Sequence, residues 1–275
     1  MRLFIHHRTD YRFSEPQARL VQLLRLTPGS HEGQVVANWR IDVDCDARLK
    51  RSRDGFGNET TMLYVDRSIE QISLSVEGEV LTDDRAGLVA GTVETLPPLL
   101  YTQTTSLSRA SAEIADFARA IDGAGGSLLD RAHRLRGALH ERLRYDSART
   151  ATDRDAATVF AEGHGIGVDY AHVFIAAART IGLPARFVSG HLYREDADPA
   201  HRHAPHAWAE AHVEGYGWIG FDAAHDICPH EAYVRVAIGL DYRDAAPVSG
   251  ARKGGGHEML EVGVHIGLSR AQVQS

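Results

Sequence analysis

The first eighty residues show the alternation of side chains that is typical of β-strands. Residues 4–13 place a set of side chains at every second position, as a strand with one buried face does. The members of that set are Ile5, His7, Thr9, Tyr11 and Phe13. Residues 35–43 and 69–80 are also rich in strand-forming residues, and the turn-forming residues 54–58 lie between them. The pattern predicts an N-terminal antiparallel β-sandwich in which His7 is a packed side chain.

The period of the apolar positions changes after Pro97 and Pro98. Residues 111–120 and 127–143 carry apolar side chains at spacings of three and four, and Ser111 and Ser127 stand where helix caps are expected. We therefore predict two domains, residues 1–96 and 97–275, with the proline pair at the boundary.

A third helix is predicted to begin at Gly167 and to stop before residues 182–184. Residues 186–192 and 206–213 have the pattern of strands, and residues 215–217 turn the chain into a further strand at 218–222. A strand-like segment at 259–266 is assigned to this second domain. The fold class is therefore α+β.

Composition narrows the range of functions. The 275 residues include 43% hydrophobic and 24% charged residues, and the net charge is −7. Phosphate binding requires clustered cations, so an acidic chain with scattered basic residues argues against a nucleic-acid partner. The N-terminal residues contain no signal-like apolar segment and no run is long enough for a membrane span, so we expect a cytoplasmic protein without a membrane partner. A homo-oligomer is compatible with these features, and the two cysteines form no disulfide framework.

Three segments resemble the active-site blocks of the bacterial transglutaminase-like superfamily. They are Gly165-Ile166-Gly167-Val168-Asp169-Tyr170-Ala171-His172, His206-Ala207-Trp208-Ala209-Glu210 and Gly217-Trp218-Ile219-Gly220-Phe221-Asp222. The first domain is similar to the N-terminal β-domain of such proteins, at His7, Thr9, Tyr11, Pro16, residues 26–28 and residues 54–58. The resemblance implies a papain-like or transglutaminase-like core, in which helices pack on an antiparallel sheet, and a Cys-His-Asp triad.

Aligned with that triad, the histidine falls on His206 and the aspartate on Asp222, but the cysteine position holds Gly167. A cysteine at a helix start becomes a nucleophile because the helix dipole and a neighbouring imidazolium stabilise its thiolate. Glycine offers no such atom. Two further departures accompany this loss, since Val168 replaces the family's glutamine and His225 replaces its usual asparagine.

Three functions remain open from the sequence. The first is a pseudoenzyme that keeps its cleft to bind a peptide or protein ligand through Gly167, Val168, Asp169, Trp208 and His225. The second is a hydrolase that uses His206 as a base for water. The third is a cysteine peptidase or amidase whose cysteine has been replaced, although the change at Val168 favours natural loss.

The second function could also use a metal. The candidate ligands are His164, His206, Asp222 and His225, with His201 and His203 nearby in sequence. No HExxH or paired CxxC motif accompanies them, so we expect neither a metal nor another cofactor. Cys228 lies six residues after Asp222, but a buried apolar role is the commoner one for such a thiol.

Overall fold

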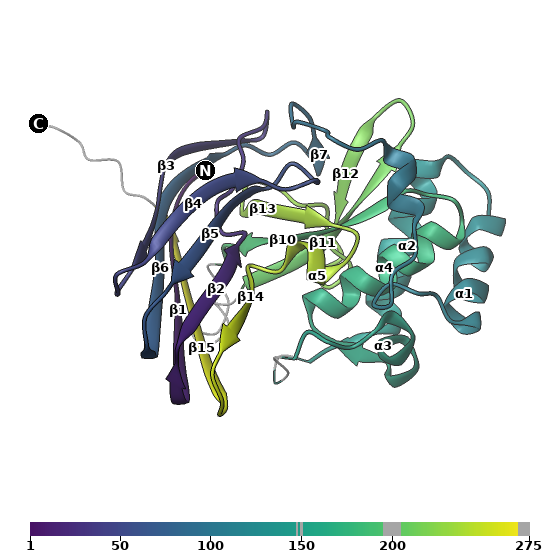
Figure 1. Ribbon diagram of the computed structural model, residues 1–275. Helices are drawn as coiled ribbons and strands as arrows, with labels where there is room; N and C mark the ends of the chain where they lie inside the picture. Colours follow the sequence, from purple (N-terminus) through teal and green to yellow (C-terminus); the bar gives the residue numbers. More distant parts are fainter. Residues whose placement is uncertain (147, 149–150, 195–204, 269–275) are drawn as a thin grey trace, which may run out of the picture.

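The structure, a computed structural model, describes residues 1–146, 148, 151–194 and 205–268. Strands form one half of the molecule and helices cover the far side (Figure 1). The strands of the first half are β1 (Arg2–Gln17), β2 (Arg19–Leu24), β3 (Gln34–Val43), β4 (Arg48–Arg53), β5 (Glu59–Val65), β6 (Ile69–Thr82), β14 (Val248–Lys253) and β15 (Glu258–Leu268). The other elements are β7 (Leu88–Val89), the 3-10 helix η1 (Pro98–Thr102), α1 (Ala112–Gly123), α2 (Leu128–Arg142), β8 (Arg144–Tyr145), α3 (Ala156–Glu162), β9 (His164–Gly165), α4 (Gly167–Thr180), β10 (Ala185–Leu192), β11 (Pro205–Val213), β12 (Gly217–Phe221), β13 (Tyr233–Gly239) and α5 (Tyr242–Ala245).

The first half is an antiparallel sandwich of two sheets, in the strand orders β15-β1-β6-β3 and β14-β2-β5-β4. The alternation along β1 has the predicted phase, because Ile5, His7, Thr9, Tyr11 and Phe13 are all buried. Side chains of the two sheets meet in one core, which includes Tyr11 and Ile72 from one sheet and Leu24 and Leu63 from the other. Each such burial contributes about 1.5–3 kcal/mol. The predicted sandwich is confirmed.

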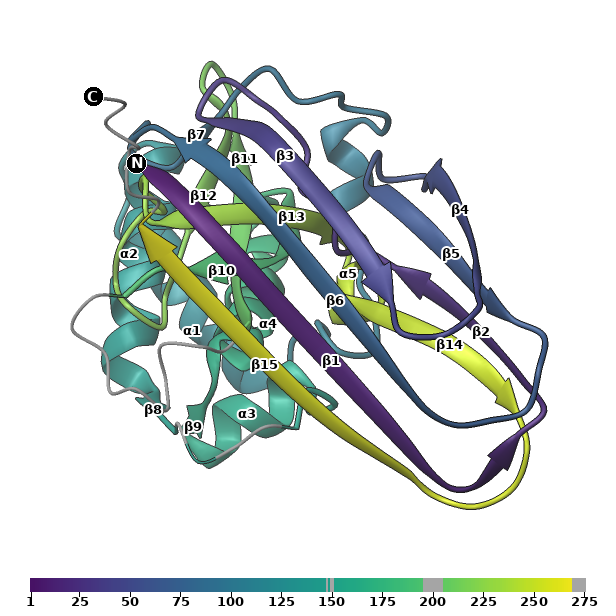
Figure 2. The same ribbon diagram turned by 90° about the vertical axis from the view of Figure 1, so that its left-hand side faces the viewer.

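The sheet that contains β1 is longer than its partner sheet, and its strands run diagonally across the molecule (Figure 2). At one end it packs on the second sheet of the sandwich. At the other end Leu3 and Ile5 pack on Val234 and Val236 of β13, which belongs to the helix-covered half. One face of β1 therefore contributes to two cores.

The C-terminal strands join the sandwich, which corrects the assignment of residues 259–266 to the second domain. β15 pairs with β1 along its whole length, with Leu260 opposite Tyr11, and β14 pairs with β2. Partners some 250 residues apart leave no trace in a local pattern of polar and apolar positions. The division at residues 96 and 97 into separately folding domains stays a prediction.

The helix starts follow local signals. The Ser111 hydroxyl accepts a hydrogen bond from the amide of Ile114, and Ser127 forms a reciprocal capping box with Asp130. α4 begins at Gly167 as predicted. α3 was not predicted; its first turn is held by the Asp155 carboxylate, which accepts from the amide of Thr158.

The helix-covered half is built on a five-stranded antiparallel sheet in the order β13-β10-β11-β12-β7. One face of it, with Phe187, Ala209 and Phe221, packs on α4 in a core that also takes in α1, α2 and α3. The opposite face lies towards the sandwich. This arrangement confirms the predicted α+β class. Among the described residues no helix is long and apolar enough to cross a membrane.

Two buried histidines lie where β1 meets the five-stranded sheet. The rings of His7 and His191 are perpendicular, with centroids 5.8 Å apart, and both side chains are almost fully buried. Burial lowers the pKa of His7 to about 4 and the pKa of His191 to about 3. Both imidazoles are therefore neutral in the folded protein at neutral pH.

We predict that the free energy of unfolding falls as the pH drops from about 6.5 towards 4. The unfolded chain takes up protons at these histidines below their ordinary pKa of about 6.5, whereas the folded chain excludes them. Each histidine then contributes a slope of up to about 1.4 kcal/mol per pH unit. Chemical denaturation across this pH range measures the slope.

The variant His191→Phe should reduce that slope by the contribution of one histidine, which is up to about 1.4 kcal/mol per pH unit. His257→Gln is the matched control, because His257 is exposed, and it should leave the slope unchanged. Equal slopes for His191→Phe and the unmodified chain would contradict the prediction.

Candidate functional site

The site begins at the first turn of α4. Gly167 is its first residue, and the buried Asp169 carboxylate accepts a hydrogen bond of 2.9 Å from the amide of Ile166. Asp169 also forms an ion pair with Arg154. Asp169 therefore fixes the start of the helix, and the structure gives no support to the binding role expected for it.

His206 faces this helix start from β11. β11 and β12 pair antiparallel, with Ala209 opposite Phe221, so the beginning of one strand lies beside the end of the other. His206 Nε2 lies 2.7 Å from Oδ2 of Asp222. Because a carboxylate only accepts hydrogen bonds, Nε2 carries the proton. In the neutral ring Nδ1 is then an acceptor.

The acceptor side of the His206 ring lies against Gly167. A Cβ placed on Gly167 would lie 2.9 Å from Cε1 of His206, 3.0 Å from Nδ1 and 3.1 Å from the carbonyl oxygen of Ala207. Contacts this short require the ring to shift. Gly167 has no positive φ, so the restriction comes from crowding and not from the backbone conformation. The imidazole occupies part of the space that a larger side chain would need.

Asp222 is the centre of the polar network. Its Oδ2 accepts from His206, from Nδ1 of His225 at 2.8 Å and from the Tyr233 hydroxyl at 2.7 Å. Its Oδ1 accepts from the amides of Ala224 and His225 at 2.9 and 3.3 Å. Burial alone would raise the pKa of Asp222, but His206 and His225 hold it well below its ordinary value. The carboxylate is therefore ionised, and its charge is met by five donors.

Aromatic rings enclose the network on the sheet side. Trp208 stacks on His206 with ring centroids 6.2 Å apart, and Tyr233 meets the Trp208 ring edge-on. Burial and the nearby Asp222 charge raise the pKa of Tyr233 far above its ordinary value, so its hydroxyl stays protonated as a donor. Tyr233 was not predicted from the sequence, because a lone tyrosine at the start of a strand carries no distinctive signal.

The outer edge of the network is formed by His225, Arg194 and Tyr145. Because His225 Nδ1 donates to Asp222, its Nε2 accepts, and Arg194 lies 3.3 Å from that atom. The His225 side chain is 21% exposed and Tyr145 is 41% exposed, whereas the His206 side chain is 8% exposed. His225 and Tyr145 are therefore more exposed than His206. Neither Tyr145 nor Arg194 was identified from the sequence.

Several residues expected at the site lie apart from the network. His164 pairs with Asp146 at 3.1 Å and does not join His206 and Asp222, which corrects its place among the candidate metal ligands. Val168 is half-buried and packs on the helical core. The thiol of Cys228 lies 3.4 Å from Arg136, and burial raises its pKa. His201 and His203 lie outside the described residues.

A buried ion network lies further along the same strands. The Glu210 carboxylate on β11 pairs with Arg186 at 2.6 Å and with Arg235 at 2.7 Å, and Arg186 also pairs with Glu94. Glu210 and Arg186 are fully buried. Burial would raise the pKa of Glu210, but Arg235 and Arg186 lower it to about 2. The guanidinium of Arg186 also lies 3.8 Å from the centre of the Trp218 ring.

His206, Asp222 and His225 also form a group of three metal-type donors, whose ligand atoms lie within 4.8 Å of one another. A tetrahedral zinc with bonds of about 2.0–2.1 Å holds its ligand atoms roughly 3.3 Å apart. Both imidazole nitrogens lie closer than that to Oδ2 of Asp222. The residue types suit zinc, but the hydrogen-bonded arrangement would have to open to admit it.

Comparison with known proteins identifies two regions of the chain. Residues 115–223 match the transglutaminase-like superfamily, and residues 3–81 match the bacterial transglutaminase-like N-terminal region. An uncharacterized protein of Mycobacterium leprae is 26% identical over 286 residues, which cover 96% of this chain and 98% of the relative. An uncharacterized protein of Mycobacterium tuberculosis is 28% identical over 274 residues, which cover 90% of this chain and 86% of the relative.

A solved structure from Cytophaga hutchinsonii has the same fold. It is named for a proposed cysteine protease activity, and its TM-score with this chain is 0.77 at 20% sequence identity. The match covers all of this chain and 92% of the other. At this identity the likeness concerns the fold alone.

We predict that Asp222→Ala lowers the free energy of unfolding by about 3–5 kcal/mol, because it leaves three side-chain donors, two of them buried, without their acceptor. Tyr233→Phe removes one of these donors and should cost about 1 kcal/mol. Urea denaturation of both variants at pH 7 measures the two losses.

Glu214→Ala serves as the control, since Glu214 is exposed just after β11. It should change the free energy of unfolding by less than about 0.5 kcal/mol. A loss for Asp222→Ala as small as the control's would mean that the carboxylate does not hold this part of the fold together.

Proposed function

We propose that this chain, a member of the transglutaminase-like superfamily, is a pseudoenzyme that binds a peptide or protein amide beside Gly167 without cleaving it. The observation that carries the proposal is the close approach of the His206 ring to Gly167. The position from which a nucleophile would act is not only without a reactive atom but is also too crowded for one in the present arrangement.

The neighbours of His206 supply no replacement nucleophile. Within the described residues its ring lies beside Gly167, Asp222, Trp208, His225 and Tyr233. The Tyr233 hydroxyl donates to Asp222 and its pKa is raised, so it is a poor source of an attacking oxygen. Cys228 faces Arg136 and not the imidazole. Among the described neighbours of the ring, no atom is therefore available on which a covalent acyl intermediate could form.

The surviving polar groups suit an amide. An amide offers one N–H donor and one carbonyl acceptor. His206 Nδ1 is an acceptor in the tautomer that Asp222 imposes, and Arg194 is a cationic donor at the outer edge. Tyr145 adds an exposed ring on which an apolar side chain of the ligand can pack. This arrangement supports binding of an uncharged peptide amide.

A second candidate is a hydrolase that activates water on a metal held by His206, Asp222 and His225. The proximity of the three donor atoms favours it, since two imidazoles and a carboxylate are a ligand set that zinc accepts. The short hydrogen bonds to Asp222 weigh against it. Added zinc therefore belongs in the test of function.

We predict that the protein binds benzyloxycarbonyl-Gln-Gly-amide saturably and does not turn it over. Loss of a triad nucleophile removes several powers of ten of the rate enhancement and leaves binding contacts in place. Calorimetry measures the binding, and chromatography of the peptide after a day with and without added zinc measures turnover. A fluorescent amine in the same reaction tests for transfer.

His225→Ala and Tyr145→Ala should each weaken this binding, and Arg51→Ala, far away on β4, should not. Absence of saturable binding would refute the pseudoenzyme as described. Turnover that requires His206 but no metal would support a water-activating hydrolase, and turnover that appears only with zinc would support the metal candidate.

We predict that Gly167→Cys produces a thiol that reacts with iodoacetamide at pH 6.5 about tenfold or more faster than a free thiol, because a thiolate beside an imidazolium at a helix start has a lowered pKa. Mass spectrometry of the labelled peptide measures the rate. The variant is also the enzyme of the third candidate function, so its peptide hydrolysis is worth measuring. The crowding at Cβ predicts a lower thermal stability than that of the unmodified chain.

The control is the double variant Gly167→Cys, His206→Ala, in which the imidazole is missing and the rate should fall to that of a free thiol. Gly167→Cys with Val168→Gln tests whether the second departure limits hydrolysis. Equal alkylation rates with and without His206 would show that the ring no longer acts on this position.

A further inference from the structure

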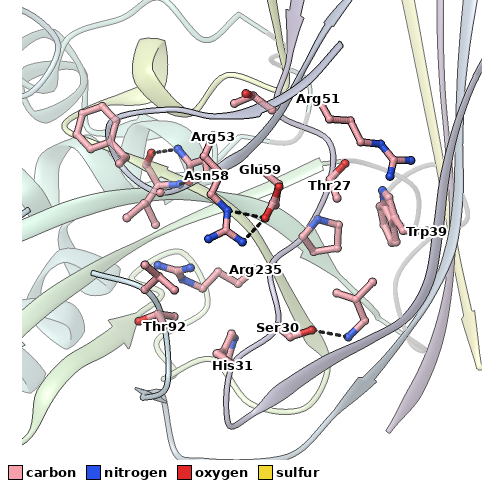
Figure 3. A pocket seen from close by; sticks show the side chains of 18 of the residues that line it. Thr27, Ser30, His31, Trp39, Arg51, Arg53, Asn58, Glu59, Thr92 and Arg235 are labelled. Atoms are coloured by element: carbon pink, nitrogen blue, oxygen red, sulfur yellow. Dashed lines mark hydrogen bonds and ion pairs between the residues drawn. The ribbon is translucent and has the colours of Figure 1, made fainter. Parts of the chain in front are cut away.

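A cavity of about 490 Å³ lies in the sandwich half, away from the Asp222 network. Its walls come from both sheets of the sandwich, from residues 27–31 and 92–94, and from β13 (Figure 3). The volume falls in the range of small-molecule sites, which is about 300–1,000 Å³. None of Gly167, His206, Asp222 and His225 lines it.

Three arginines line this cavity: Arg51 and Arg53 from β4, and Arg235 from β13. Arg53 pairs with Glu59, and Arg235 pairs with Glu210. The other carboxylate on the wall, Glu94, is held by Arg186. Every acidic side chain that lines the cavity is therefore already engaged by an arginine.

Of these three arginines, Arg51 is the one without an acidic partner among the described residues. Within the part of the chain that the structure describes, its side chain forms no ion pair or hydrogen bond, and it lies exposed on the strand whose sequence is Arg-Leu-Lys-Arg-Ser-Arg. The wall therefore carries one uncompensated positive charge. A ligand with a single negative charge neutralises it, whereas a dianion would bring a charge that nothing there meets.

His31 adds an unused donor. Its Nδ1 accepts a hydrogen bond of 3.2 Å from the amide of Gly33, so in the neutral ring the proton is on Nε2. That Nε2 is buried and has no partner among the described residues. Burial and the nearby Arg235 lower the pKa of His31 to about 4, so the ring is neutral at pH 7. A buried N–H without an acceptor is costly, but this one has no surface open to a ligand, so the ring would have to move before it could donate to one.

Part of the remaining wall is apolar and held in place, and polar side chains such as Thr27, Ser30 and Thr92 form the rest. Trp39, Ile41, Phe56 and Ile238 line the cavity. The indole N–H of Trp39 donates to the carbonyl of Leu26 at 2.9 Å, which fixes the ring. The side chain of Asn58 ties the same wall to both backbone groups of Ile238 on β13 at 2.8 Å. A ring or hydrocarbon body therefore meets a preformed surface.

We propose that this cavity is a binding site for a small organic monoanion, a carboxylate joined to an apolar or aromatic body. Arg51 neutralises the carboxylate, and the body packs on Trp39 and Phe56. The site is separate from the amide site beside Gly167 and does not depend on it.

The experiment uses 1-anilinonaphthalene-8-sulfonate, a fluorescent aromatic monoanion, and the full chain at 0.15 M salt. Saturable binding of one probe per chain is expected. Arg51→Ala should weaken it about three- to fivefold, as expected for an exposed charge pair in 0.15 M salt. Lys50→Ala is the matched control, because it removes the same charge from the same exposed strand but does not line the cavity, and it should change the affinity less than twofold.

Two ligand comparisons test the chemistry. N-phenyl-1-naphthylamine has the same rings without the anion and should bind more weakly than the sulfonate. 1-Naphthoate should displace the sulfonate more effectively than 1-naphthyl phosphate. Thermal unfolding of each variant confirms that it is folded.

Equal weakening by Arg51→Ala and Lys50→Ala would overturn the proposal, because it would show attraction by the basic strand as a whole. Equal affinity of the uncharged naphthylamine, or binding that does not saturate, would overturn it as well. Stronger displacement by the phosphate than by the carboxylate would refute the monoanion assignment.

Discussion

The arrangement around the site depends on one buried carboxylate. Asp222 can remain ionised inside the protein only because five donors surround it, and those donors come from separate segments of the chain. His206 lies at the start of β11, Tyr233 at the start of β13 and His225 in the turn between β12 and β13. Removing these partners would leave an uncompensated charge inside the protein, which strongly destabilises the folded state. The network therefore fixes the ends of three strands relative to one another.

This constraint explains how a histidine and an aspartate can persist beside a glycine. In an acyl-transfer enzyme the aspartate sets the tautomer of the histidine, and the histidine serves the nucleophile. Here the same hydrogen bond sets the same tautomer, but the acceptor nitrogen of His206 faces Gly167. The geometry of the pair satisfies the buried charge whether or not chemistry follows. Retention of the pair is therefore compatible with loss of catalysis.

Features that depend on neighbouring residues were predicted from the sequence, whereas contacts between distant segments were not. Ser111 and Ser127 were recognised as caps because a cap acts on amides three residues away. Three features join residues that are far apart in sequence, and no residue spacing predicts them. They are the pairing of β15 with β1, the hydrogen bond from Tyr233 to Asp222, and the network of Arg186, Glu210 and Arg235. His164 shows the opposite error. It lies close to Gly167 in sequence and was predicted near the site, but its side chain pairs with Asp146. The resemblance paired His206 with Asp222, and their side chains hydrogen-bond, but only the structure shows how near the ring lies to Gly167.

β13 links the two halves of the molecule through three neighbouring side chains. Tyr233 donates to Asp222, Val234 packs on the long sheet of the sandwich, and Arg235 binds Glu210 while it lines the cavity. Because Arg235 and Arg186 share a fully buried carboxylate, withdrawing Arg235 towards a ligand would remove one of the two cations that hold Glu210, which is costly inside the protein. Arg51 has no acidic partner among the described residues, so its pairing with a ligand would break no existing ion pair. The two arginines differ in their burial. Arg235 lies inside the protein and maintains the fold, whereas the side chain of Arg51 lies at the exposed edge and can pair with a ligand.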